Sequence, residues 1–200
     1  MNEIILTGEL KNIQHSHIIE DIEYSKANII SKRPDGREDT INLRFKSFSN
    51  PYKENDIVTL KGNLRSYSCK IDENTNKVTI YVFTYFDKID EEVESNNSCL
   101  IDGRICKLNN LRTTKNGKHN IHFIVANNIT SNSSTKRLNS YIPCIAWGTL
   151  AKEIANLSVN TKLKINGELH SREHKKIRPD GEIEIRVAHE LLVLGYEVLD

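Results

Sequence analysis

Two aromatic residues, flanked by cations on neighbouring segments, are the residues of this chain best suited to bind a ligand. Tyr141 and Trp147, the only tryptophan, alternate with small apolar residues and therefore fall on the outer face of a predicted strand. Cations and histidines on the adjoining segments complete this candidate set: Arg112, Lys115, Lys118, His122, Arg172, His174, Lys176 and Arg178. Flat rings beside cations suit unpaired bases and their phosphates. A lone outward tryptophan can equally be a packing or interface residue, so that alternative stays open.

The first half of the chain offers a second set on the outer face of other predicted strands. Its members are Arg44, Lys46, Phe48, Arg65 and Tyr67. A charged strand face is often only solvated, so nucleic-acid binding and solvation are equal alternatives here. Two further outward aromatic residues, Tyr81 and Phe83, are predicted to lie in an interface between domains or subunits rather than to stack on a ligand.

Other kinds of chemistry are not indicated. His15 and His17 share a strand face without a further ligand, and His170 and His174 lie too far apart along a strand to hold one ion. The sequence contains no phosphate-binding glycine loop, no nucleophile elbow and no carboxylate pair of defined spacing. We therefore predict no metal site, no cofactor and no enzyme activity.

Composition indicates a soluble globular protein, with 38% hydrophobic and 28% charged residues. No apolar run is long enough to span a membrane and the first residues do not look like a signal segment, so we expect a cytoplasmic protein. The four cysteines are expected to be reduced core residues, with zinc or a disulfide as alternatives. The net charge of +1 is unevenly distributed: it is −1 over 1–90, −3 over 91–96 and +5 over 97–200.

The sequence contains an internal repeat of about one hundred residues. Residues 2–10 align with 97–105, and 55–66 align with 160–171, with Gly62 over Gly167. A repeat of this length indicates a duplicated domain rather than a solenoid. An acidic and polar run separates the copies. We predict domain 1 over 1–90, a linker over 91–96 and domain 2 over 97–200.

Each copy has the pattern of five strands. They are predicted at 3–13, 23–32, 40–48, 57–67 and 78–84, and at 98–108, 118–127, 140–147, 161–172 and 182–188. In the second copy a short helix capped by Thr149 lies between the third and fourth strands, whereas its counterpart at 49–55 is too short and is interrupted by proline. This order is typical of the oligonucleotide-binding (OB) fold. We predict an all-β chain of two tandem OB-fold five-stranded Greek-key barrels, the first degenerate and without the helix.

Three motifs of the second copy resemble the bacterial single-stranded-DNA-binding protein family. They are Lys-Asn-Gly-Lys at 115–118, Trp-Gly-Thr-Leu-Ala within 141–155, and Leu-Lys-Ile-Asn-Gly-Glu-Leu-His-Ser-Arg ending at Arg172. The resemblance covers nearly all of the second copy, but only the first and fourth strands of the first. Primosomal replication protein N is a related family with this fold.

The resemblance implies sequence-independent binding of single-stranded DNA in replication, recombination, repair or mobile-element processing. It places stacking positions at Tyr141, Trp147 and His174, and it implies a homodimer with four OB domains and contacts with replication or recombination proteins. Two departures stand out: the chain lacks the family's acidic tail, and Asn42 replaces the stacking residue at the start of the third strand of the first copy. The alternative is a protein-interaction adaptor in primosome or replisome assembly.

Overall fold

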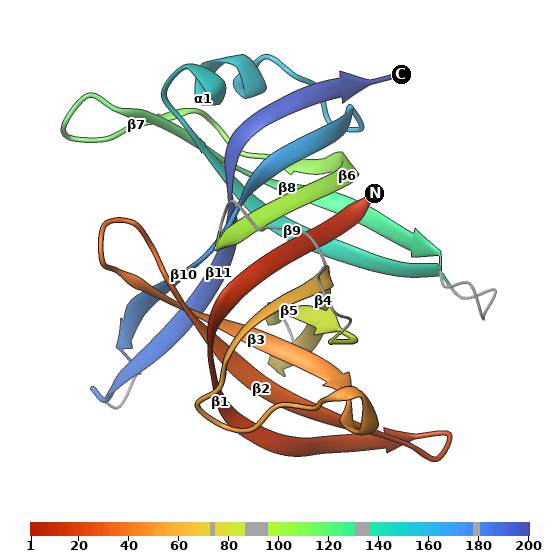
Figure 1. Ribbon diagram of the computed structural model, residues 1–200. Helices are drawn as coiled ribbons and strands as arrows, with labels where there is room; N and C mark the ends of the chain where they lie inside the picture. Colours follow the sequence, from red (N-terminus) through yellow and green to blue (C-terminus); the bar gives the residue numbers. More distant parts are fainter. Residues whose placement is uncertain (73–74, 87–95, 131–136, 178–180) are drawn as a thin grey trace.

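The computed structural model describes residues 1–72, 75–86, 96–130, 137–177 and 181–200 (Figure 1). The strands are β1 (Asn2–Ile19), β2 (Ile22–Lys32), β3 (Glu38–Lys46), β4 (Ile57–Asp72), β5 (Thr75–Thr84), β6 (Asn97–Leu108), β7 (Arg112–Thr113), β8 (His119–Thr130), β9 (Arg137–Trp147), β10 (Lys162–Ile177) and β11 (Ile183–Leu199). A 3-10 helix, η1 (Ser47–Ser49), follows β3, and α1 (Gly148–Ala155) follows β9. No helix of the described residues is long and apolar enough to cross a membrane.

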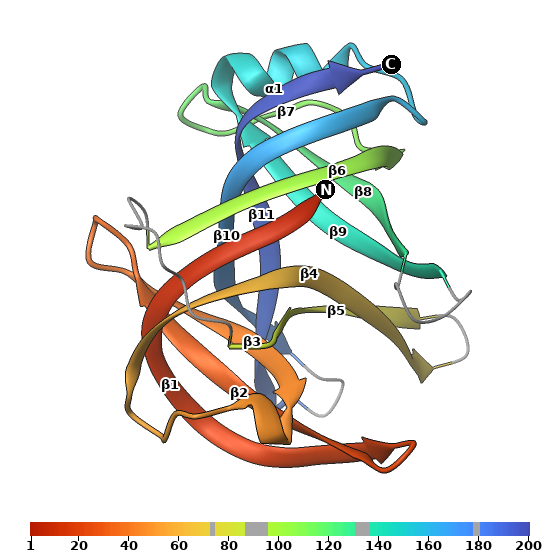
Figure 2. The same ribbon diagram turned by 45° about the vertical axis from the view of Figure 1, so that its right-hand side comes forward.

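The strands close into two barrels, one from β1 to β5 and the other from β6 to β11 (Figure 2). In the first barrel, β1 pairs with both β2 and β4, and a short parallel pairing of β3 with β5 completes the closure. The second barrel repeats this with β6, β8 and β10 and with the parallel pair β9 and β11. Both interiors are filled by alternate apolar residues of the strands. The prediction of two tandem OB folds is confirmed.

The two barrels share one sheet because β1 pairs antiparallel with β6, with Ile4 opposite Cys99. The asparagine that begins each of these strands makes the same contact in both barrels. The Asn2 amide bonds the backbone N–H and carbonyl of Leu64, each at 2.8 Å, and the Asn97 amide bonds those of Leu169 at 3.0 and 2.7 Å. The alignment of the two copies therefore holds at the level of single hydrogen bonds.

Glycines lie where strands cross at the barrel corners. A Cβ on Gly62 would lie 2.6 Å from the carbonyl oxygen of Phe83, and one on Gly103 would lie 2.7 Å from that of Ala126. These approaches exclude any side chain, as expected for strongly coiled strands.

The open end of each barrel is closed differently. In the second barrel α1 buries Ala151 and Ile154, while Leu150 and Leu157 pack partly buried against the core. The predicted Thr149 cap was wrong: Trp147 occupies the N-cap position, and its side chain makes no capping hydrogen bond. In its described residues the first barrel has only η1, and Phe86 packs edge-on against Phe45, with 4.9 Å between the ring centroids. Tyr52 also packs against Phe86, with 5.6 Å between the ring centroids.

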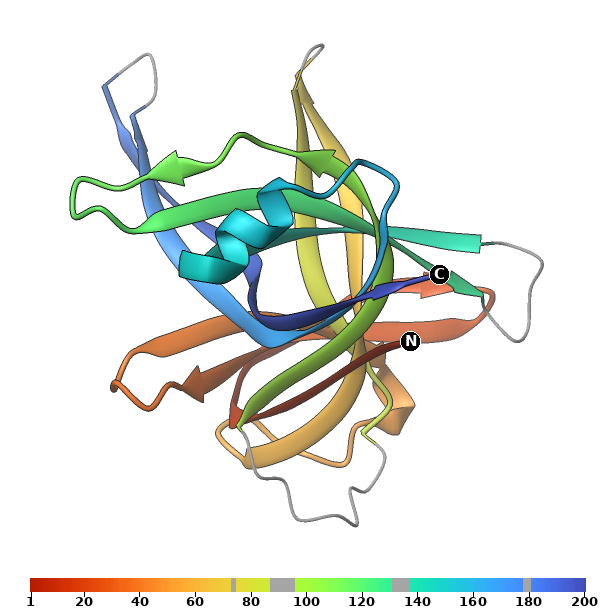
Figure 3. The same cartoon turned by 90° about the horizontal axis from the view of Figure 1, so that it is seen from above.

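The last strand of the second barrel differs from its prediction. The apolar alternation of the strand predicted at 182–188 would place Ile183 and Ile185 in the core, but they are 62% and 61% exposed, and Leu191 and Val193 fill the core instead. The apolar alternation is real, but it belongs to a two-stranded ribbon of β10 and β11 that extends beyond the barrel. The β4–β5 and β10–β11 ribbons project toward the same side of the molecule (Figure 3). The predicted linker lies outside the described residues except for Asn96, so the domain boundaries stay predictions.

Each ribbon is hydrogen-bonded to the opposite barrel. Ser66 Oγ accepts the N–H of Tyr141 at 2.7 Å, and Ser171 Oγ accepts the N–H of Thr40 at 2.9 Å. Asp39, fully buried, strengthens the second contact by accepting the N–H of Ser171 at 2.6 Å and the Nε–H of Arg33 at 2.6 Å. Burial disfavours the ionised carboxyl, but the Arg33 and Ser171 hydrogen bonds outweigh it and lower the pKa of Asp39.

Replacing Asp39 should therefore destabilise the fold and change its acid sensitivity. Asp39→Asn leaves the buried Arg33 guanidinium unpaired, and we expect a loss of about 3 kcal/mol in the free energy of unfolding at neutral pH. A lowered native pKa gives stability that is complete above the unfolded pKa, near 4, and is lost as the pH falls through the native value. Urea unfolding at neutral pH and near pH 3 measures both effects.

Asp35→Asn is the matched control, because Asp35 pairs with Arg37 in solvent, where ion pairs contribute little. The wild-type chain and this control should lose more stability on acidification than Asp39→Asn. Unchanged stability of Asp39→Asn at neutral pH would contradict the role of this contact.

Candidate nucleic-acid interface

The outer face of β9 carries the two aromatic residues singled out by sequence. Tyr141 is 44% and Trp147 is 41% exposed, and Trp147 ends the strand where α1 begins. His122 lies on the neighbouring β8, opposite Ile145 in the register. Strand alternation places Ile145 on the same outer face as Tyr141 and Trp147, but Ile145 is buried, and β11 pairs beside it with Leu192 opposite.

A hollow of about 610 Å³ lies next to Trp147. Of the predicted cations, Arg172 on β10 lines it, whereas Arg112, Lys115 and Lys118 are exposed around the β7–β8 turn and do not. Arg33 and Arg37 of the first barrel, which flank the Pro-Asp-Gly turn at 34–36, also line it, because the contact between the barrels brings them there. Arg178 lies outside the described residues, as do the side chains of His174 and Lys176.

Acidic side chains reduce the positive charge of this hollow. Glu190 lies in its wall, with Oε2 3.7 Å from Nδ1 of His122, and Glu173 and Glu38 are also present. The hollow is thus of mixed charge, although residues 97–200 together carry a net charge of +5.

The first barrel has a groove of about 420 Å³ across β2, β3 and the β4–β5 ribbon. Arg44 lies against two neighbouring tyrosine rings, with its Cζ atom 4.5 Å from the Tyr67 centroid and 4.7 Å from the Tyr81 centroid. Tyr81, predicted as an interface residue, lines this groove. Cation–π contacts of this kind hold the guanidinium plane against the rings while its edge stays free to donate.

Phe83 was predicted to be outward, and this was wrong. It is only 6% exposed, and the Arg65 guanidinium lies over its ring, with Cζ 4.1 Å from the centroid. The rings of Tyr24 and Tyr85 also lie beside it, with centroids 6.3 and 5.1 Å away, and β3 pairs in parallel with β5 at Phe83. Such a pairing cannot be read from the alternation of a single strand.

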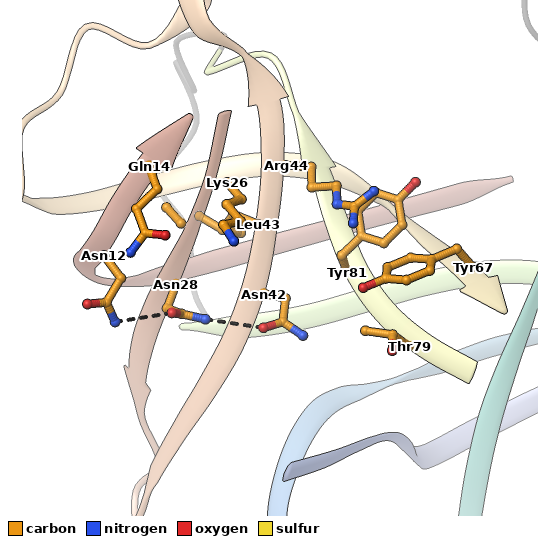
Figure 4. A pocket seen from close by; sticks show the side chains of 11 residues that line it. Asn12, Gln14, Lys26, Asn28, Asn42, Leu43, Arg44, Tyr67, Thr79 and Tyr81 are labelled. Atoms are coloured by element: carbon orange, nitrogen blue, oxygen red, sulfur yellow. Dashed lines mark hydrogen bonds between the residues drawn. The ribbon is translucent and has the colours of Figure 1, made fainter. Parts of the chain in front are cut away.

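The remaining predicted residues of the first barrel lie at its edge. Phe48, in η1, is 77% exposed, and Lys46 Nζ lies 5.7 Å from its ring centroid. Neither lines the groove. The groove instead contains residues that sequence reasoning missed: Asn12, Gln14, Lys26, Asn28, Asn42 and Thr79 (Figure 4).

Strand registers give the correspondence between barrels. Thr40 lies opposite Ile30 on β2, just as Tyr141 lies opposite Ala126 on β8. The backbone N–H groups of Thr40 and Tyr141 each donate to the serine of the opposite ribbon. Thr40 therefore occupies the Tyr141 position, and the assignment of that position to Asn42 was wrong. Counting along β3 places Lys46 at the position of Trp147. The stacking residues of β9 thus have no aromatic counterparts on β3.

A third hollow adjoins these two. It has a volume of about 480 Å³, lies between the barrels, and shares Asn28, Asn42 and Thr79 with the first groove and Glu190 with the hollow at Trp147. We call this series of three adjoining hollows, from Asn12 to Trp147, the surface path.

Within the described residues, no group of three or more histidine, cysteine, aspartate or glutamate side chains could hold a metal ion. Cys99 and Cys144 are buried in the core, and burial raises the pKa of both thiols. The Cys106 thiol is exposed, while the side chain of Cys69 is not among those that the structure describes.

Comparison with known proteins agrees with the resemblance found in the sequence. Residues 96–190 match the Single-strand binding protein family. The crystal structure of the wild-type single-stranded DNA binding protein from Thermus aquaticus superposes with a TM-score of 0.72 at 15% identity, covering 100% of this chain and 93% of that one. A deletion mutant of the same protein gives 0.72 at 16% identity, covering 100% and 94%. This likeness supports the tandem OB fold over the whole chain.

A weaker structural match is to the protein priB from Ralstonia solanacearum, with a TM-score of 0.39, 14% identity and coverage of 52% of this chain and 98% of that one. It is too distant to bear on the fold. Comparison with curated proteins gives no match.

The placement of Trp147 can be tested optically, because it is the only tryptophan. At 41% exposure its fluorescence should be readily quenched by acrylamide, and denaturation should increase the quenching only modestly. The double substitution Y141W/W147F moves the indole to the other exposed position and should give similar quenching. Strong protection of Trp147 in the folded chain would contradict its outward placement.

Proposed function

We propose, from the match of residues 96–190 to the Single-strand binding protein family and from the path of adjoining hollows on both barrels, that this chain binds single-stranded DNA. The observation that carries the proposal is the pair of exposed aromatic residues on β9, Tyr141 and Trp147, of which Trp147 lines the hollow at one end of this path. Bases stack on such rings whatever their sequence, because every base has a flat face. Binding is therefore independent of any defined sequence along most of the strand.

Cations around the path would hold the phosphates. Arg172 lies beside Trp147, and Lys26 and Arg44 lie in the groove of the first barrel. Lys26 and Arg44 make no ion pair within the described part of the chain, so their charges are available to phosphates. The remaining cations at the β7–β8 turn extend the basic surface past Trp147.

The proposed setting is replication, recombination, repair or mobile-element processing, where exposed single strands need protection. Two OB domains per chain would give four in a homodimer. Replication or recombination proteins are the proposed further partners, and the proposed location is the cytoplasm. The proposed role is one of binding, without enzyme activity.

A protein-interaction adaptor is the second candidate, favoured by the exposed apolar residues of the β10–β11 ribbon. Ile177 and Ile183 lie opposite each other near its tip, and Ile185 follows on β11. Such a surface suits contact with another protein. In this case binding of DNA would be weak or absent.

Titration with oligo-dT separates the two candidates. We expect strong quenching of Trp147 fluorescence by stacked bases, with an affinity that falls steeply as salt rises because phosphate contacts release counterions. Duplex DNA of the same length is the control and should bind more weakly. Absence of any response at low salt, in fluorescence and in the anisotropy of labelled oligonucleotide, would refute DNA binding and leave the adaptor.

A pair of substitutions tests whether the second barrel contributes more to DNA binding than the first. Trp147→Ala should weaken oligo-dT binding by about 1 to 3 kcal/mol, the usual range for one stacked base. Phe48→Ala is the matched control: it removes a more exposed aromatic residue that lies outside the groove, and it should lose less. Anisotropy of a labelled oligonucleotide measures both. Equal losses would show that Trp147 is not the dominant stacking residue.

A further inference from the structure

The groove of the first barrel contains an ordered set of amide side chains that stacking and phosphate binding do not explain. We infer that this groove is a binding pocket for one purine base, recognised through hydrogen bonds to its N7 edge. The inference rests on the proposed function, since a single strand must deliver the base. It adds a base preference at one position of the path.

The pocket is built from two adjacent rows of side chains across β1, β2 and β3. In one row Gln14 pairs with Lys26 and Lys26 with Arg44, and in the next Asn28 pairs directly with Asn42. Because directly opposite residues of a sheet share a face, each row brings its side chains together. Figure 4 shows the rows side by side, with Tyr67 and Tyr81 beyond Arg44.

The three asparagines form a chain of hydrogen bonds. Asn12 Nδ2 donates to Asn28 Oδ1 at 3.3 Å, and Asn28 Nδ2 donates to Asn42 Oδ1 at 3.2 Å. Asn42 Nδ2 then donates to the carbonyl oxygen of Ile80 at 3.2 Å. An amide has two N–H donors and two oxygen lone pairs. Asn28 and Asn42 therefore each keep one donor and one acceptor, held in fixed orientation.

The backbone at Asn12 brings its side chain to this row. The residue has a positive φ of 56° and lies at an irregularity of the β1–β2 pairing between Lys11 and Gln14. Asparagine tolerates this left-handed conformation better than most residues. Bulges of this kind redirect side chains and are common beside functional sites.

The available groups match purines better than pyrimidines. Asparagine and glutamine amides bind the N6 and N7 atoms of adenine, and lysine and arginine bind O6 and N7 of guanine. The shared atom is N7, which pyrimidines lack. No carboxylate is among the described residues that line the pocket, so it has no strong acceptor for the cytosine amino group. The Arg44 plane and the two tyrosine rings supply a wall for stacking.

The second barrel serves as an internal comparison. Its counterparts of Asn28 and Asn42 are Ile124 and Pro143, which pair in the same register, and Ile145 replaces Arg44. The same fold thus positions apolar residues where the first barrel has amides and a cation. The amide row is therefore a property of the first barrel and not a requirement of the fold.

Oligonucleotides that differ only at N7 test the inference. The wild-type chain is titrated, by anisotropy, with labelled oligo-dT and with the same strand carrying deoxyadenosine, 7-deazadeoxyadenosine or deoxycytidine at regular intervals. The deoxyadenosine strand should bind at least about five-fold more tightly than the other three, the effect of one bidentate base contact. The 7-deaza base keeps the stacking surface, so it separates N7 recognition from stacking.

Variants locate the effect. N28A/N42A should keep salt-sensitive binding of oligo-dT but lose the purine preference, whereas Asn166→Ala, an exposed position on β10, should keep both. Equal affinity of the wild-type chain for all four strands would overturn the pocket and leave the proposed function standing. Failure of every strand to bind would overturn both. If the double variant does not fold, the affinities of the wild-type chain for the deoxyadenosine strand and the 7-deazadeoxyadenosine strand still decide whether N7 is recognised.

Discussion

The antiparallel pairing of β1 with β6 determines how the two barrels are placed. It joins the barrels through equivalent strands in a reciprocal register, with Asn2 opposite Ile101 and Leu6 opposite Asn97, so the barrels are related by an approximate two-fold axis. Each long ribbon must then extend toward the opposite barrel, where Ser66 and Ser171 bond equivalent backbone amides. The central hollow between the grooves is a consequence of this pairing, since residues of both barrels line it.

Although the two barrels are related by this symmetry, they differ in the side chains that close the barrel end and that hold the ribbon. One barrel closes its end with α1, the other with Phe86 and Tyr52. The contact at Ser171 contains a buried carboxylate and a guanidinium, whereas at Ser66 the equivalent position is a buried serine, Ser140. The symmetric part of the structure is mostly backbone and small polar groups. The asymmetric part is side chains, and it includes every group for which we propose a role in binding.

The sequence predicted the parts of the fold that depend on local pattern. Strand alternation, the corner glycines and the repeat were enough to identify two OB barrels and the outward position of Trp147. Errors arose wherever a strand distant in sequence determines the exposure of a side chain. Phe83 and Ile145 are buried beside parallel strand pairings, and Ile183 is exposed because it lies on a ribbon that extends beyond the core. The amide row was missed because its members come from three strands and because Asn12 reaches it through a bulge. Asparagine in a strand carries no signal that distinguishes a solvated position from an ordered row.

The divergence of the two grooves has a consequence for how a strand would be held. Two subsites on one chain act together, because binding at one raises the effective concentration at the other. If both subsites only stacked bases, a strand could shift by one nucleotide at little cost, since all bases stack. A purine subsite in the first barrel removes this equivalence, because only some registers place N7 against Asn28 and Asn42. The stacking residues of the second barrel would then supply affinity without restricting sequence, and the first barrel would set the register of the strand on the protein.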